Sequence, residues 1–145
     1  MTIRLGTDIV YIPRIRALID RFGKRFLQRV YTPIEQQNSG YREEEITPMA
    51  IAKLAGRWAA KEAVVKALGT GWQGINYTDV EICRTQNGVP FPTLYNNAAE
   101  IVAKWGVEEK SEGEKGNTPD PNHGWQLSLS HDRDYAIATA IFVAL

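Results

Sequence analysis

The stretch from Thr47 to Gly69 constrains this chain most, because it carries the start, the stop and the periodicity of one long helix. Thr47 can accept a hydrogen bond from a free backbone N–H of the first turn, and Pro48 falls at the first helical position, where no N–H is needed. Gly69 is the residue type that best tolerates the left-handed conformation closing a helix. Residues 48 to 68 are therefore expected to form a helix roughly 31 Å long.

Apolar residues recur along this stretch at three- and four-residue steps, which predicts one buried face made of Ile51, Leu54, Ala55, Trp58, Ala59 and Val65. Glu62 lies at the edge of that face, where a carboxylate is unfavourable without a partner. Lys66 follows one turn later, and Lys61 and Arg57 form a second basic row. Two interpretations stay open: a surface helix with a Glu62–Lys66 pair, or a site that holds a hard cation and a polyanion.

The whole chain bounds the class of protein. Its 145 residues suffice for one domain with its own core. A single cysteine excludes an intramolecular disulfide and a multi-cysteine zinc site, and the first residues have no signal-peptide layout, so we expect a cytoplasmic protein. The longest apolar run, Ala136 to Leu145 with Thr139 inside it, is too short to span a bilayer. With 17 basic and 17 acidic residues, no global field favours nucleic acid.

Several strands and a second helix are expected around the long helix. Residues 3 to 10 predict a strand in which Asp8 interrupts an apolar run, and an acid there is either paired or functional. Four further strands are predicted at 80–84, 89–92, 125–130 and 135–144. Asn96 is expected to start a helix that ends at Trp105. Residues 107–123 are polar and carry glycine and proline, which predicts a mobile surface insertion.

The segment between residues 13 and 29 predicts a basic amphipathic helix, which Gly23 can divide in two. Its apolar stripe consists of Ile12, Ile15, Leu18, Ile19, Phe22 and Phe26. From residue 14 to residue 29 there are six basic residues and one acidic residue. Such a charge run is either a solvated face or a surface for an acidic partner, nucleic acid or membrane.

Two further features are candidates for anion contacts. Three glycines in residues 69–74, directly after the long helix, would let backbone N–H groups approach a phosphate, although taken alone they favour a plain turn. The segment lacks the Gly-Lys-Ser/Thr ending of a Walker loop. His131 lies at the end of a predicted strand, where it is either structural or a donor to phosphate.

Four segments, taken together and in this order, resemble the holo-acyl-carrier-protein synthase family, the small 4′-phosphopantetheinyl transferases of fatty acid synthesis. They are Gly6–Ile9 with Arg14-Ile15, Gly56–Ala63, Gly69–Gly71, and Ser128–His131 with Tyr135-Ala136. The most specific element is the Trp-x-x-Lys-Glu-Ala core of the second segment, preceded by Gly-Arg. Trp58 stands where Phe is common in this family, and residues 107–123 form a longer insertion than the family leads us to expect.

The resemblance implies a single α/β (α+β) domain over residues 1–145, with the long helix packed on an antiparallel sheet. It also implies a homotrimer with active sites at the subunit interfaces. Coenzyme A would be the donor and magnesium the cofactor. The reaction would move 4′-phosphopantetheine to a serine of apo acyl carrier protein, in fatty acid biosynthesis, and release adenosine 3′,5′-bisphosphate. Neither a nucleic acid nor a membrane is an expected partner.

The family pattern also implies roles for individual residues of this chain. Asp8 and Glu62 match the magnesium ligands and, with Lys66 near the leaving phosphates, make up the catalytic set. Candidates for coenzyme A contacts are Arg57, Lys66, Gly69, Gly71 and His131. The first helix resembles the docking surface for the acidic carrier, with Arg14, Leu18, Arg21 and Arg25 as candidate contacts.

Three points stay open at the level of sequence. The general base is either a carboxylate or a metal-bound water. A basic nucleic-acid-binding module is one alternative function, although Phe22 and Phe26 are expected on the core stripe and not free to stack on bases. A nucleotide hydrolase with a carboxylate-bound metal is another.

Overall fold

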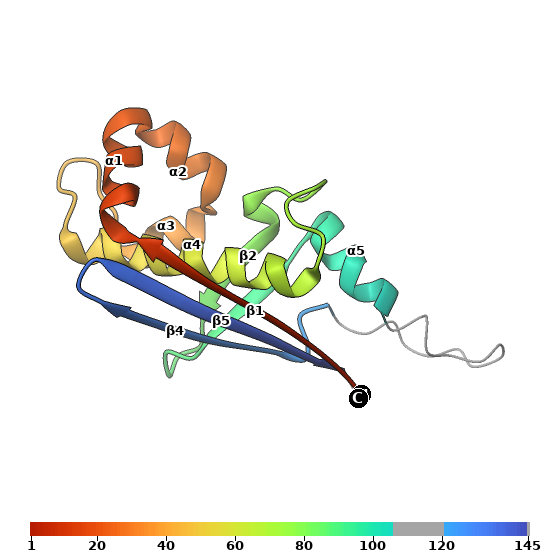
Figure 1. Cartoon of the computed structure of the whole chain (residues 1–145). Helices are drawn as coiled ribbons and strands as arrows, with labels where there is room; N and C mark the ends of the chain where they lie inside the picture. Colours follow the sequence, from red (N-terminus) through yellow and green to blue (C-terminus); the bar gives the residue numbers. More distant parts are fainter. Residues whose placement is uncertain (106–120, 145) are drawn as a thin grey trace.

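The long helix predicted from the sequence is α4 (Pro48–Leu68), and it runs through the middle of the computed structural model (Figure 1). The hydroxyl of Thr47 accepts a hydrogen bond from the N–H of Ala50 at 3.1 Å, and Gly69 closes the helix with a φ of 80°. The structure describes residues 1–105 and 121–144. Most of the predicted insertion at 107–123 lies outside these residues, so its character remains a prediction.

Burial on α4 extends well beyond the single face that the sequence predicts. Besides most of the predicted stripe, the small residues Ala60, Ala63 and Ala67 are buried. The helix is therefore packed from several sides, by a sheet on one side and by helices and a hairpin on the others (Figure 1). Small side chains allow this close packing because they let neighbouring backbones approach α4.

A three-stranded antiparallel sheet covers one side of α4. Its order is β1 (Thr2–Tyr11), β5 (Tyr135–Ala144) and β4 (Trp125–Asp132). β1 pairs with β5 along its whole length, from Thr2 opposite Ala144 to Tyr11 opposite Tyr135. The predicted antiparallel sheet against the long helix is thus confirmed, with strand ends shifted by one or two residues.

The contact between β1 and α4 is unusually close at Gly6. A Cβ atom at this position would lie 1.8 Å from the carbonyl oxygen of Ala63 and 2.8 Å from the backbone nitrogen of Ala67. Only glycine allows the two backbones to meet in this way. The consequence is that Asp8, two residues further along β1, lies beside the last turns of α4.

The remaining elements cover the other sides of α4. α1 (Ile12–Phe22) and α2 (Lys24–Val30) are separated at Gly23, as the sequence allows, and lie on the opposite side of α4 from the sheet (Figure 1). The other elements are α3 (Pro33–Ser39), the 3₁₀ helix η1 (Tyr77–Asp79), the hairpin of β2 (Val80–Arg84) and β3 (Pro90–Leu94), and α5 (Asn96–Trp105). No helix among the described residues has the length and apolar composition needed to cross a membrane.

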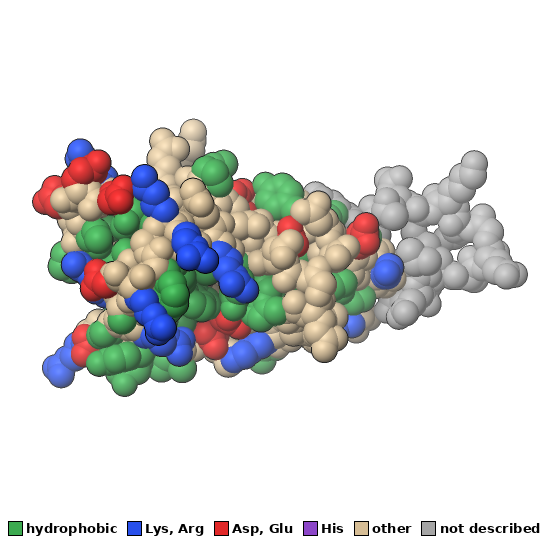
Figure 2. Space-filling model, turned by 90° about the horizontal axis from the view of Figure 1, so that it is seen from above, with side chains coloured by type: hydrophobic (Ala, Val, Ile, Leu, Met, Phe, Trp, Pro, Cys, Tyr) green, Lys and Arg blue, Asp and Glu red, His purple; other side chains and the backbone are tan. Residues whose placement is uncertain are grey.

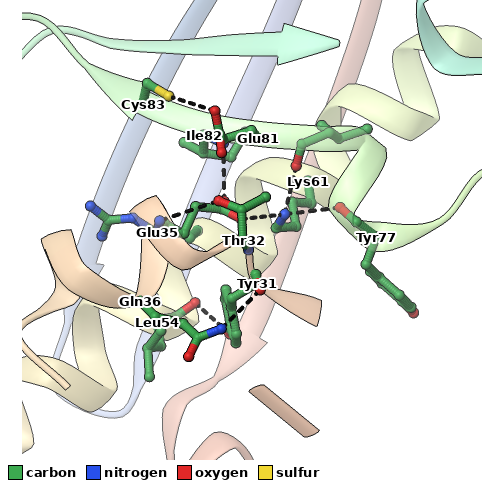
Figure 3. A network of polar contacts seen from close by, with 12 residues as sticks. Tyr31, Thr32, Glu35, Gln36, Leu54, Lys61, Tyr77, Glu81, Ile82 and Cys83 are labelled. Atoms are coloured by element: carbon green, nitrogen blue, oxygen red, sulfur yellow. Dashed lines mark hydrogen bonds and ion pairs between the residues drawn. The ribbon is translucent and has the colours of Figure 1, made fainter. Parts of the chain in front are cut away.

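A buried ion pair joins these elements in the interior. Lys61 Nζ lies 2.7 Å from Glu35 Oε1, and both side chains are fully buried (Figure 3). The ammonium also donates to the carbonyl oxygens of Tyr77 at 2.9 Å and Val80 at 2.6 Å, while Glu35 accepts from the N–H of Ile82 at 3.0 Å. Burial lowers the pKa of Lys61, and the carboxylate of Glu35 opposes that shift. Lys61 is therefore not part of an exposed basic row, and its role is to connect α4 with α3, η1 and β2.

Candidate active site

Asp8 and Lys66 form an ion pair between β1 and α4. Lys66 Nζ lies 3.0 Å from Asp8 Oδ1 and donates to the backbone carbonyl of Thr7 at 2.9 Å. The Asp8 side chain is 18% exposed, and that of Lys66 is 55% exposed. An acid in this half-buried position is stabilised by the cation, and the cation itself stays accessible to an anionic ligand.

Glu62 lies one turn before Lys66 on α4, and two tryptophans hold its carboxylate. Trp58 Nε1 donates to Oε1 at 3.0 Å, and Trp72 Nε1 donates to Oε2 at 3.1 Å. Trp58 comes from the preceding turn of the same helix, whereas Trp72 comes from the loop that follows α4. The orientation of Glu62 is thus set from both sides.

Asp8, Glu62 and Lys66 make up one cluster: Lys66 contacts Asp8, and Glu62 lies one turn before Lys66 on the same face of α4. The described residues contain no group of three or more His, Cys, Asp or Glu side chains that could hold a metal. A cation at this cluster would therefore take one or two carboxylates from the protein and complete its shell from water and phosphate. Magnesium commonly binds in this way, so the donor set fits it.

Two of the predicted phosphate contacts are the glycines that follow α4, in the segment between Lys66 and Trp72. Gly69 and Gly71 both have positive φ, 80° and 63°, which glycine adopts without strain. The N–H of Gly69 is already bonded to the carbonyl oxygens of Val65 and Lys66 as part of the helix cap. Of the two candidates for phosphate contacts, Gly69 therefore shapes the loop, and the cap leaves Gly71 as the better-suited backbone donor.

Arg57 and His131 lie elsewhere on the chain. Together with Gly56, Arg84 and Leu129 they line a groove of about 1080 Å³ between α4, the hairpin and the end of β4, and none of Asp8, Glu62 and Lys66 lines it. Within a single chain, the predicted site residues thus fall into two separate groups.

Arg57 is poised for an anion at the wall of this groove. It is 5% exposed, and its Nη1 donates to the carbonyl of Lys53 at 3.3 Å. Its Nε finds no hydrogen-bond partner in the described part of the chain. Burial lowers the pKa of Arg57, and the Glu35 carboxylate opposes that shift. A buried guanidinium with a free N–H favours an incoming phosphate or carboxylate. His131 is exposed at the rim.

The basic face predicted from the sequence lies on α1 and α2, where Figure 2 shows Lys and Arg side chains gathered around exposed apolar ones. Its predicted contacts are Arg14, Leu18, Arg21 and Arg25, of which the three arginines are exposed and Leu18 is partly buried. Leu18 and Arg25 line a smaller groove of about 360 Å³, and Trp58 lines it too. The basic face therefore adjoins the side chain that binds Glu62.

One expectation about this face is wrong. Phe22 is 43% exposed, with the guanidinium of Arg21 4.9 Å from its ring centre, whereas Phe26 is buried as expected. The reason is the break at Gly23, which changes the direction of the chain, so that Phe22 ends α1 outside the core.

Sequence reasoning missed Trp72 and Tyr77, which complete the surroundings of Glu62. The ring of Tyr77 lies 4.1 Å from that of Trp72 and 5.9 Å from that of Trp58, between centroids. Both residues lie in segments whose path the local pattern does not specify. The only sequence signal was the presence of large aromatic residues in a short loop, where burial of their rings requires a tertiary partner.

Comparisons with known proteins agree on one family. Residues 4–140 match the model of the 4′-phosphopantetheinyl transferase superfamily. The holo-[acyl-carrier-protein] synthase of Gloeobacter violaceus is 45% identical over 136 residues, covering 94% of this chain and 89% of that protein. That of Protochlamydia amoebophila is 50% identical over 143 residues, covering 98% of each.

Solved structures give the same result. The holo-[acyl-carrier-protein] synthase of Helicobacter pylori, in complex with coenzyme A, superposes with a TM-score of 0.71 at 27% identity, over 96% of this chain and 99% of that one. The enzyme of Neisseria meningitidis superposes with a TM-score of 0.69 at 29% identity, over 97% and 98%.

Proposed function

This chain belongs to the 4′-phosphopantetheinyl transferase superfamily, and we propose that it is a holo-acyl-carrier-protein synthase. It transfers 4′-phosphopantetheine from coenzyme A to a serine of apo acyl carrier protein. The observation that carries this conclusion is the identity of 45% to 50% with such synthases over nearly the whole chain. The clustering of Asp8, Glu62 and Lys66 supports it independently, because phosphoryl-type transfer needs charge neutralisation at the phosphates.

In this reaction the serine oxygen forms a bond to the phosphorus of the phosphopantetheine group. The bond from that phosphorus to the bridging oxygen breaks, and adenosine 3′,5′-bisphosphate leaves with the electron pair. Asp8 and Glu62 would hold magnesium, which when bound supplies neutralisation of the pyrophosphate charge. Lys66 places an ammonium beside the leaving phosphates, and the serine proton passes to a carboxylate or to water.

The second group, Arg57 and His131, would contact further phosphates of coenzyme A. The proposal is that these contacts come from a neighbouring subunit of a homotrimer, so that each active site lies at an interface. The separation of the two groups within one chain supports this arrangement.

The outer face of the sheet also supports a contact between subunits. Ile3, Leu5 and Ile9 are all at least 60% exposed on β1, whereas Arg4, Gly6 and Asp8 point toward α4. The more apolar side of the strand thus faces outward, and a contiguous apolar surface of this kind is typical of a subunit contact.

The basic face on α1 and α2 would dock the carrier protein. The family resemblance implies an acidic carrier protein, and opposite charges on the two proteins increase their rate of association. The proximity of this face to Trp58 and Glu62 supports its use for delivering the serine to the carboxylate cluster. A cytoplasmic location and a place in fatty acid biosynthesis complete the proposal.

Incubation with coenzyme A, magnesium and apo carrier protein, followed by mass spectrometry of the carrier, tests the function. The carrier should gain the mass of one phosphopantetheine group, and adenosine 3′,5′-bisphosphate should appear in equal amount. A chelator should suppress both. Coenzyme A cleaved without any gain in carrier mass would indicate a hydrolase instead.

A further inference from the structure

Two neutral hydrogen-bond donors hold Glu62, and the proposed function assigns a role to neither. The indole N–H groups of Trp58 and Trp72 each bind a different oxygen of the carboxylate, at 3.0 and 3.1 Å. A carboxylate held at both oxygens cannot rotate freely, so the lone pairs that remain for a cation point in fixed directions.

The two indoles are themselves fixed by aromatic packing. The ring of Tyr77 lies against both of them, and the ring of Phe26 lies 5.4 Å from that of Trp58, between centroids. Trp58 belongs to α4, but Trp72 belongs to a loop, and its position therefore depends on Tyr77.

Tyr77 is anchored in turn by the buried ion pair. Its carbonyl oxygen accepts a hydrogen bond from Lys61 Nζ at 2.9 Å, and Lys61 is held by Glu35 at 2.7 Å (Figure 3). A continuous set of contacts thus runs from the interior of the protein to the carboxylate of Glu62.

The partners of the two carboxylates differ in charge. Asp8 is paired with the ammonium of Lys66 at 3.0 Å, so its nearest partner is a cation. Among the described residues, the hydrogen-bond partners of the Glu62 carboxylate are the two indoles, which donate hydrogen bonds but carry no charge. Glu62 is therefore oriented without being neutralised, which leaves its charge available to a cation.

We propose that Trp58 and Trp72 are positioning residues that hold Glu62 in the orientation in which it binds magnesium. The proposal rests on the proposed function, since it takes Glu62 as a magnesium ligand. It predicts that the indole N–H, and not only the aromatic ring, matters for metal binding.

Trp58→Phe and Trp72→Phe test this, because each keeps a packed ring and removes one donor. Each should raise the magnesium concentration for half-maximal activity by roughly tenfold. The Michaelis constant for coenzyme A at saturating magnesium should stay near that of the parent. Trp125→Phe is the matched control, because Nε1 of Trp125 donates to the carbonyl of Pro121 at 3.0 Å and not to Glu62. Loss of this hydrogen bond should leave the magnesium midpoint unchanged.

A fluorescence titration gives a readout that does not depend on turnover. The chain has four tryptophans, so Trp105→Phe with Trp125→Phe leaves Trp58 and Trp72 as the only indole reporters. Magnesium chloride, added alone and with coenzyme A but without carrier, should change their emission, and Glu62→Gln should abolish that change. This titration still tests the positioning role if a Trp→Phe variant at residue 58 or 72 does not fold.

The possible failures are distinguishable. A parent protein that transfers nothing would refute the proposed function. An active parent whose indole emission ignores magnesium, or whose Phe variants keep the parental magnesium midpoint, would refute the positioning role alone. Trp→Phe variants that lose the same fraction of activity at every magnesium concentration would also refute the positioning role.

Discussion

Gly6 sets how closely β1 approaches α4, and through this approach it places Asp8 beside Lys66. Its missing Cβ is what allows the contact, since that atom would lie 1.8 Å from the carbonyl oxygen of Ala63. The sequence shows a glycine in a strand and an acid two residues later, but it does not show what either residue faces. Position on a strand is a local property, whereas the partner across the interface depends on the whole fold.

Gly6→Ala should lower the free energy of unfolding by about 3 kcal/mol, because β1 must move away from the α4 backbone. Gly56→Ala is the control within α4: its Cβ would meet Leu129 at 3.6 Å, an ordinary contact, and alanine stabilises a helix interior by about 0.5–1 kcal/mol. Urea denaturation compares the two. Equal effects of the two variants would contradict the close contact at Gly6.

Asp8→Asn and Glu62→Gln should each remove most transferase activity while leaving the fold intact. Both changes keep the shape of the side chain but remove the ligand charge that a hard cation needs. Circular dichroism checks the fold, and a magnesium titration of turnover checks the mechanism. Near-normal turnover of either variant at low magnesium would make the metal assignment wrong.

The thiol of Cys83 should react slowly with alkylating reagents. Burial, together with the nearby carboxylate of Glu81, raises the pKa of Cys83 to about 11, and Sγ lies 3.5 Å from Glu81 Oε1. The folded protein keeps the thiol proton to higher pH than the unfolded chain does. This contribution to stability is therefore complete below the ordinary cysteine pKa and is lost as the pH rises through about 11.

The pH dependence of alkylation by iodoacetamide checks this pKa. The folded protein should show a midpoint near 11, and the same protein in denaturant should return to the ordinary thiol value. A folded-state midpoint at the ordinary value would mean that the thiol is neither desolvated nor influenced by Glu81.

At the scale of elements, α4 was the most predictable part of the fold. Its cap, its first-turn proline and its closing glycine act within a few residues, so the sequence predicts both ends correctly. The surroundings of Glu62 were not predictable, since Trp72 reaches it from a loop whose path depends on Tyr77 and the interior ion pair. Even Lys61, one residue from Glu62, points into the core.

α1 carries the clearest prediction at this scale. Arg14→Glu combined with Arg21→Glu should raise the Michaelis constant for the carrier protein by roughly tenfold or more, because opposite charges at a rim set the rate of association. The constant for coenzyme A should barely change. Added salt should slow the parent more than the variant.

Lys104→Glu on α5 is the control, since it makes an exposed residue acidic away from the basic face. It should leave the constant for the carrier near that of the parent. Equal losses for carrier protein and coenzyme A in the α1 variant would assign the helix to the catalytic site or to the fold instead of docking.

For the whole molecule, composition and charge predicted a globular domain, and the mixed helix and antiparallel sheet is confirmed. Contacts between subunits are harder to predict from the sequence, because an apolar residue in a strand gives the same pattern whether the core or another subunit covers it. On β1, the residues pointing outward are Ile3, Leu5 and Ile9, which local reasoning would place inside. Only the fold distinguishes the two faces.

The proposal that Arg57 and His131 act on the Asp8 cluster of a neighbouring subunit has a genetic consequence. Two inactive alleles, one encoding Asp8→Asn and the other Arg57→Gln with His131→Ala, should complement each other. In mixed trimers, an interface that pairs the intact carboxylates of one subunit with the intact basic groups of the next is active, which random assembly gives at about a quarter of the sites. Co-expression with two affinity tags, or exchange of purified subunits, measures the recovered activity, and light scattering measures the trimer. If every mixture stayed inactive although mixed trimers were isolated, each subunit would hold its active site alone. If the active site is shared, a cell that carries both defective copies regains an enzyme that neither copy encodes.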